Sequence, residues 1–268
     1  MTETAVKILK ENYALYHRPE YIDPDPLLFP RRYQRPLDVE AAAFIAASFA
    51  LGRVNLIIAF LERVFSALSP LGPHEGLVSR SEKELGEIFS DFKYRFYASE
   101  DIVHFMKGLR QLYLEYGSIE ACFMTGHSMA GVDGMPASAV LSGFTGVADK
   151  INRQGSKRNV VSNPRAGSAC KRLFLFLRWV VRSDDIDPGI WSLSPSELII
   201  PLDTHVMRVS RYLGLTNRRS ADFKTAAEIT DNLKLIDKVD PVRYDFSMSR
   251  IGIHPDLDYS ELENNKVE

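Results

Sequence analysis

The stretch GSACKRLFLFLRWVVR, residues 167–182, mixes apolar and basic side chains with the period of a helix. At about 100° per residue its apolar side chains gather on one face, which predicts a helix side buried in the core. These apolar residues are Leu173, Phe176, Leu177 and Val180. The opposite arc carries the basic residues Lys171, Arg178 and Arg182. The stretch therefore predicts a core helix whose other face is cationic.

Positive charge is concentrated in this part of the chain, although the 268 residues carry a net charge of only −2. Residues 150–183 contain no Asp or Glu, so everything outside them sums to −11. The basic residues in that window are Lys150, Arg153, Lys157, Arg158, Arg165, Lys171, Arg172, Arg178 and Arg182. A second acid-free stretch, 204–221, adds Arg208, Arg211, Arg218 and Arg219. Such local fields attract polyanions, whereas a solvated helical face would explain any one cluster alone.

Composition limits the kinds of protein that this chain can be. A hydrophobic content of 45% and a charged content of 25% are ordinary for a globular protein of one large or two small domains. No apolar run reaches the roughly 18 residues of a membrane span, and the N-terminus lacks the apolar centre of a signal peptide. Two cysteines exclude a disulfide scaffold, a four-cysteine zinc site and an iron–sulfur cluster. We therefore expect a cytoplasmic monomer, at most nucleoid-associated, with no membrane contact, metal or cofactor.

Apolar residues recur at helical spacing nearly everywhere, which predicts an all-α fold. We expect helices over residues 36–52, 54–68, 81–92, 99–117 and 135–152, with a Pro- and Gly-bearing loop over 68–76. Ser81 and Glu84 have the spacing of a capping box, and Ser99 is the expected cap of the fourth helix.

Lys171 and Asp203 are the residues best suited to take part in catalysis. Each also has an ordinary structural interpretation. Lys171 has both cationic and apolar neighbours in sequence, which favour the neutral, nucleophilic amine. A lysine at a helix start can equally extend its charge into solvent. Asp203 stands where an N-cap belongs, and a capping Asp contributes roughly 0.5–2 kcal/mol without any catalysis.

The segment PLDTHVMRVSRYLGL, residues 201–215, resembles the aspartate-bearing segment of the helix–hairpin–helix DNA glycosylase superfamily. Asp203 matches the catalytic aspartate of that superfamily, and Lys171 occupies the place of the nucleophilic lysine of its bifunctional members. The spacing between them looks most like that of the archaeal 8-oxoguanine DNA glycosylases. The usual glycine-rich hairpin is replaced here by SNPRAGSACKRL, residues 162–173. The whole chain also resembles an uncharacterised family of bacterial conserved hypothetical proteins.

The resemblance implies an all-α, helix–hairpin–helix glycosylase-like fold, with two helical subdomains and a groove between them. An N-terminal helix and Pro-rich lead-in, 1–36, would precede a glycosylase-like domain, 37–253. Within that domain, 37–150 would form mostly one helical subdomain and 151–253 the helix–hairpin–helix part. The acidic residues 254–268 would form a mobile tail.

The implied function is DNA base excision, with damaged duplex DNA as partner and an oxidised purine among the possible targets. Lys171 would be the nucleophile and Asp203 the carboxylate that stabilises the sugar cation, with or without nicking of the strand. The expected DNA contacts are Lys157, Arg158, Arg165, Arg172, Arg178, Arg182, Arg208 and Arg211. Weaker candidates for the base pocket are Tyr94, Phe96, Phe174 and Asp245, although core packing explains an aromatic side chain equally well.

The alternative is a non-catalytic DNA- or RNA-binding protein that keeps the glycosylase scaffold, an interpretation favoured by the altered hairpin. Asp245 could also pair with Arg243 or lie at the surface. His205 is expected to be structural, and Cys170, although its cationic neighbours favour a thiolate, is assigned no role.

Overall fold

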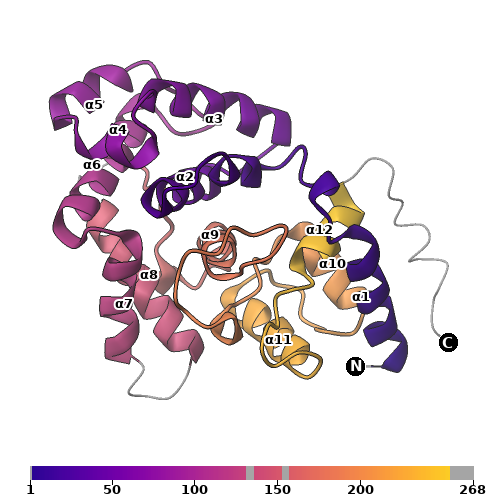
Figure 1. Ribbon diagram of the computed structural model, residues 1–268. Helices are drawn as coiled ribbons and strands as arrows, with labels where there is room; N and C mark the ends of the chain where they lie inside the picture. The colour runs from indigo at the N-terminus through magenta and orange to yellow at the C-terminus, as the bar shows by residue number, and fades with distance from the viewer. Residues whose placement is uncertain (1, 131–135, 153–156, 254–268) are drawn as a thin grey trace.

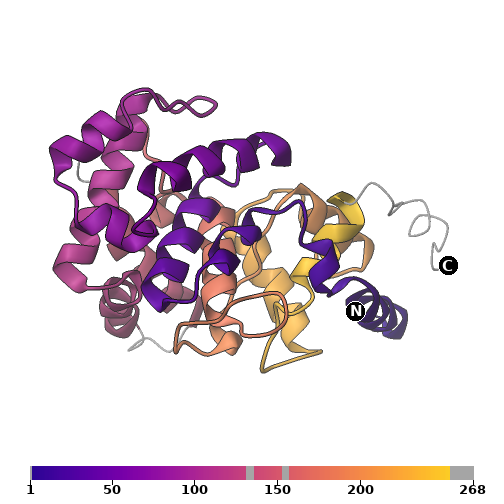
Figure 2. The same cartoon turned by 45° about the horizontal axis from the view of Figure 1, so that its top comes forward.

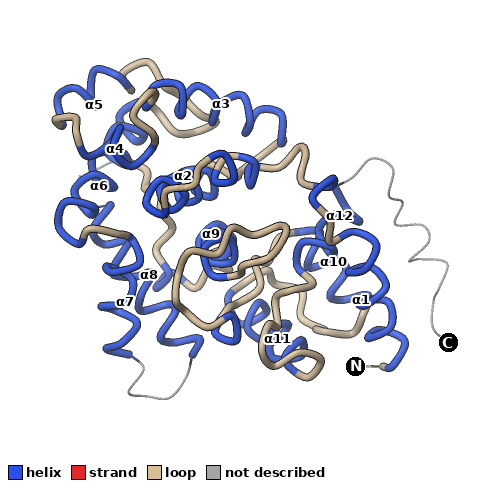
Figure 3. The backbone as a smooth tube through the Cα atoms, viewed as in Figure 1, coloured by secondary structure: helices blue, strands red, loops and turns tan. Residues whose placement is uncertain are grey.

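The computed structural model describes residues 2–130, 136–152 and 157–253, and the regular elements in those ranges are all helical (Figures 1 and 3). The α-helices in chain order are α1 (Glu3–Tyr16), α2 (Pro36–Ser48), α3 (Val54–Leu68), α4 (Pro73–Val78), α5 (Glu82–Ile88), α6 (Ser99–Tyr116), α7 (Ile119–Ala130), α8 (Pro136–Asn152), α9 (Lys171–Val181), α10 (Thr204–Tyr212), α11 (Phe223–Lys234) and α12 (Asp245–Ile253). Only isolated β-bridges join loops in these ranges. The all-α expectation is confirmed.

Helix α2 lies at the centre of the fold, packed against α9 (Figure 1). Every residue from Asp38 to Ser48 is buried, because the run AAAFIAA is apolar on all sides of the helix. The expected apolar face of α9 is buried as well, and Phe176 meets Phe44 of α2 edge to face at 5.0 Å. This contact packs the middle of α9 against α2.

The two ends of the described chain meet in space. Helix α1 packs on α12, and the two lie side by side in both views (Figures 1 and 2). Between α1 and α2 the lead-in forms three short 3₁₀ turns, η1 (Pro19–Tyr21), η2 (Pro26–Leu28) and η3 (Pro30–Arg32). One cluster of buried apolar side chains runs from Ala5 to Met248. The N-terminal residues therefore share the core of the following helices.

Several expected element boundaries differ from those observed. The capping box of Ser81 and Glu84 is present, but α5 ends at Ile88 instead of reaching 92. Ser99 is the first residue of α6, not its cap, and the Asp101 carboxylate instead accepts the N–H of Ala98. The expected loop 68–76 gives way to α4 at Pro73, because proline fits the first helical position, where no N–H bond is lost. The acidic tail, 254–268, lies outside the described residues.

A buried carboxylate connects three parts of this fold. Glu40 of α2 accepts hydrogen bonds from the backbone N–H groups of Ile119 and Glu120, at the start of α7. It also accepts one from the indole N–H of Trp191, in the segment between α9 and α10, at 2.8 Å. Burial raises the pKa of Glu40, while these donors oppose that rise. The carboxylate satisfies donors that would otherwise be buried without a partner.

We expect Glu40→Ala to lower the free energy of unfolding by about 3 kcal/mol or more, since each buried unpaired donor costs about 1–3 kcal/mol. Denaturant titration measures the change. Glu62→Gln is the matched control, because the Arg32–Glu62 pair is exposed, and such pairs contribute about 0–1 kcal/mol. Equal losses in the two variants would contradict a structural role for Glu40.

The helices of the described ranges include none that is both long enough and apolar enough to cross a membrane.

Candidate active site

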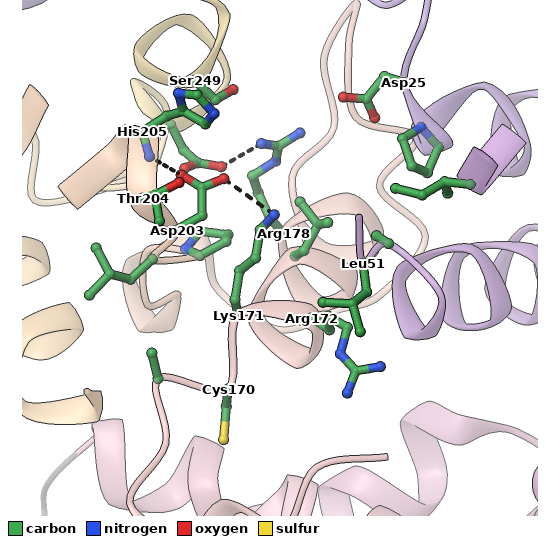
Figure 4. Close-up of a pocket in the computed structure, with 18 of the residues that line it drawn as sticks. Asp25, Leu51, Cys170, Lys171, Arg172, Arg178, Asp203, Thr204, His205 and Ser249 are labelled. Carbon is green, nitrogen blue, oxygen red and sulfur yellow. Dashed lines mark hydrogen bonds and ion pairs between the residues drawn. The ribbon is translucent and has the colours of Figure 1, made fainter. Parts of the chain in front are cut away.

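A cavity of about 790 Å³ opens beside the start of α9 (Figure 4). Its walls come from the lead-in around Asp25, the loop between α2 and α3, the starts of α9 and α10, and α12. The volume lies within the roughly 300–1,000 Å³ range of small-molecule sites. Residues from both ends of the described chain therefore enclose one space.

Lys171 and Asp203 meet in this cavity (Figure 4). Lys171 is the first residue of α9 and Asp203 is the N-cap of α10. The Nζ atom of Lys171 lies 3.2 Å from Oδ2 of Asp203, and their side chains are 35% and 17% exposed. The structure thus brings together the two residues that the sequence placed at successive helix starts, and both remain reachable from the cavity.

Asp203 uses its two carboxylate oxygens differently. Oδ1 accepts the backbone N–H groups of His205 and Val206, each at 2.9 Å, so the expected cap is formed. Oδ2 is the atom that faces Lys171. The capping interpretation is therefore confirmed, and the same cap fixes the carboxylate in the orientation that meets the amine.

The expectation that Arg178 and Arg182 face DNA is wrong. Both side chains are only 4% exposed and form a buried ion-pair network. Arg178 pairs with Asp187 and with Asp245 of α12. Arg182 pairs with the same Asp187 and, in addition, with Asp184 and Asp240. The acid-free stretch of sequence is thus compensated in space by acids that follow it in the chain.

The network sets the charge state of its members. Burial disfavours the charge of Arg178, but the carboxylates of Asp187 and Asp245 raise its pKa above the ordinary value. Burial raises the pKa of Asp245 to about 6, and the nearby charge of Asp203 adds to the rise. Asp245 lines the cavity, as expected for a pocket residue. It pairs with Arg178, whereas Arg243 pairs with Asp237.

Of the other expected DNA contacts, one lies in the cavity wall and the rest lie outside it. Arg172 lines the cavity, and its guanidinium donates to the carbonyl of Ser48 and to Oγ of Ser162, which holds the end of α2 near α9. The remaining candidates are exposed and lie outside the cavity: Lys157, Arg158, Arg165, Arg208 and Arg211. Arg165 pairs with Asp149, and Arg158 donates to the carbonyl of Phe96.

The aromatic candidates for the base pocket do not line the cavity. Tyr94 is buried and donates its hydroxyl to the carbonyl of Leu51, and Phe174 is fully buried in the core. Phe96 is exposed at 47%, away from the cavity wall. Cys170 lines the cavity, but burial raises the pKa of its thiol, contrary to the thiolate expected from its neighbours. No group of three or more His, Cys, Asp or Glu side chains in the described ranges could hold a metal ion.

Three ionisable residues of the wall were not expected there from the sequence: Asp25, His205 and Arg250. Asp25 lies between two prolines in a segment that has the composition of a loop, and Arg250 lies in the last turn of the short helix α12. Residue type and local pattern place neither one near Lys171. His205 follows the N-cap by two residues, and that spacing alone did not separate a cavity wall from helix packing.

Substitutions of Asp203 separate its two roles. We expect Asp203→Ala to lower the free energy of unfolding by about 0.5–2 kcal/mol, because the N-terminal N–H groups of α10 lose their acceptor. Asp203→Asn keeps a side-chain oxygen for the cap and should cost clearly less. Denaturant titration of both variants tests this expectation, and equal costs would show that the cap contributes nothing.

The pH dependence of Asp245→Asn tests the environment of that carboxyl. Because its pKa is raised on folding from 3.8 to about 6, its stabilising contribution is complete below about pH 4 and is lost as the pH rises through 6. The asparagine does not titrate, so wild-type stability minus variant stability should fall between about pH 4 and 7. Urea titrations of both proteins across this range measure the difference, in which titrations common to both cancel. A difference that grows with pH would contradict the shift.

No curated protein and no solved structure matches this chain. A family model described as a protein of unknown function, DUF2400, matches residues 25–254. The match begins at Asp25, includes both helix starts at the cavity and extends past the last described residue, 253. The chain is therefore a member of the DUF2400 family.

Proposed function

We propose that this protein is a DNA N-glycosylase that also acts as an abasic-site lyase through an imine formed by Lys171. The observation that carries the proposal is the Lys171–Asp203 pair, 3.2 Å apart in a cavity of about 790 Å³. An amine and a carboxylate in contact, with room beside them for a nucleoside, are the groups that this reaction needs.

The reaction makes and breaks bonds in a fixed order. As the glycosidic bond between C1′ and the base breaks, the base takes the bonding electrons and gains a proton. Asp203 Oδ2, 3.2 Å from Lys171 Nζ, accepts a proton from the Lys171 ammonium and passes it to the departing base. The neutral Lys171 amine bonds to C1′, and transfer of a proton from this nitrogen to the ring oxygen opens the sugar ring and gives the imine. Loss of a C2′ proton and of the 3′ phosphate then cuts the strand. On an abasic site the same amine condenses with the C1′ aldehyde and releases water.

Asp203 suits the electrostatic part of this reaction. Departure of the base leaves positive character on C1′, which a fixed carboxylate stabilises without reorganising during the reaction. Its cap to His205 and Val206 provides that fixed orientation. The base must leave the helical stack to reach such an enclosed site.

The glycosylase-like fold is part of the same proposal. Support comes from the order of elements, with a lysine at the start of one helix and an aspartate capping the next. The turn before α9 contains Gly167 in the left-handed region, with open space where a Cβ atom would stand. The exposed cations on α10, Arg208 and Arg211, are suited to contact phosphates on either side of the flipped nucleotide.

Reduction with borohydride tests the proposal. Borohydride should trap the wild-type protein covalently on a duplex with one abasic site, because hydride reduces the imine to a stable amine. Lys171→Ala should abolish the adduct, and Asp203→Asn should lower the rate of base release by at least about tenfold, the effect of roughly 1.4 kcal/mol on a barrier. Gel mobility of the labelled DNA measures the adduct.

The control is Lys7→Ala, because Lys7 is an exposed lysine of α1 that is also paired with a carboxylate, Glu11. It should form the adduct as the wild type does. An adduct that persists in Lys171→Ala would overturn the mechanism. Salt-sensitive DNA binding with neither adduct nor base release would favour the non-catalytic alternative.

A further inference from the structure

The wall of the cavity contributed by the lead-in and α12 carries a second charged pair, Asp25 and Arg250. The guanidinium of Arg250 donates to Oδ2 of Asp25, and the two residues are 225 positions apart in the chain. In Figure 4, Asp25 lies on the side of the cavity opposite Asp203 and Thr204. The cavity thus has a reactive pair on one side and another ion pair on the other.

Arg250 is a buried cation with one hydrogen-bond donor left unsatisfied. Its side chain is only 3% exposed, and its guanidinium lies 4.4 Å from the ring centroid of Phe246. Within the described part of the chain, its Nε–H has no hydrogen-bond acceptor. A buried donor without an acceptor costs about 1–3 kcal/mol. Because Nε is itself buried, a ligand meets Arg250 only where the side chain lines the cavity.

Asp25 presents a fixed acceptor next to this donor. Its Oδ1 accepts the N–H of Leu27 at 2.9 Å, and its side chain is 19% exposed. The surrounding wall includes Pro24, Pro26 and Leu51, which are apolar. A flat ligand that enters between these residues meets a guanidinium donor and a carboxylate acceptor along one edge.

We infer that Asp25 and Arg250 form the base-recognition end of the cavity and select nucleobases that carry a lactam edge, a carbonyl beside a ring N–H. The inference rests on the proposed function and adds its substrate class. Arg250 donates to the carbonyl oxygen, which has two lone pairs, and the ring N–H donates to the Asp25 carboxylate. Uracil, hypoxanthine and oxidised guanine carry such an edge, as do undamaged guanine and thymine, so the pair selects a class of bases and not the damage itself. An ethenoadenine or 3-methyladenine has no carbonyl beside a ring N–H.

The pair could instead only join the lead-in to α12, and this structural role makes a different prediction. A structural pair would affect folding, and so would affect every activity of the protein together. A recognition pair acts on the base alone, because an abasic sugar has no edge to bind. The ratio of base release to adduct formation on abasic DNA therefore separates the two roles.

The experiment uses the full chain and single-lesion duplexes that contain uracil, hypoxanthine, 8-oxoguanine, 1,N6-ethenoadenine or 3-methyladenine, with an abasic duplex alongside. Asp25→Asn is the first variant, because asparagine can still accept the N–H of Leu27. Arg250→Lys is the second, because it keeps the charge but loses the planar fork of donors. The matched control is Glu62→Gln, which removes one partner of an ion pair outside this cavity.

We expect the wild type to release at least one lactam base and neither of the other two. In both cavity variants the ratio of base release to abasic-site adduct should fall at least about tenfold, as expected for loss of a hydrogen bond to a charged group. The control should keep the wild-type ratio. An unchanged ratio in the folded Asp25→Asn and Arg250→Lys variants, or release of no lactam base by a wild type that forms the adduct, overturns the inference. A wild type that forms no adduct overturns the proposed function itself, and the inference with it.

Discussion

The position of Lys171 depends on a carboxylate that it does not touch. Asp187 is fully buried and binds both Arg178 of α9 and Arg182, the residue that caps the end of α9. Through these arginines the same network reaches Asp245 on α12 and Asp240 before it. Removing one member of such a network leaves a buried charge uncompensated, at a cost of roughly 3–5 kcal/mol. The network therefore fixes α9 against α12, and with α9 the direction in which its first residue points.

The helices could be predicted because they depend on local signals, whereas the Lys171–Asp203 meeting was expected from the resemblance to the glycosylase superfamily. A buried helix face, an N-cap and two successive helix starts can be recognised within short windows. The role of Arg178 and Arg182 could not be recognised in the acid-free window alone, since their partners lie beyond it. Asp184 and Asp187 follow within a few residues and offered a signal. Asp245, 67 positions from Arg178, offered none.

The aromatic residues also show that local sequence does not predict which side chains line the cavity. Tyr94 and Phe174 are chemically suited to stack on a base. Both are instead buried in the core, where aromatic side chains often lie. The cavity wall instead uses residues whose local sequence is unremarkable, such as Asp25 between its two prolines. Their proximity follows from the packing of α1 and the lead-in on α12, which no local pattern encodes.

The contact between Asp25 and Arg250 also bears on when the cavity is completed during synthesis. The ribosome adds Asp25 early and Arg250 more than two hundred residues later. The part of the cavity wall around Asp25 is therefore synthesised long before the α12 residues that complete it. Fragments that stop before α12 lack the partner of α1, one end of the buried network and a side of the cavity. Nascent or prematurely terminated chains therefore carry the lysine and the aspartate without the enclosure around them.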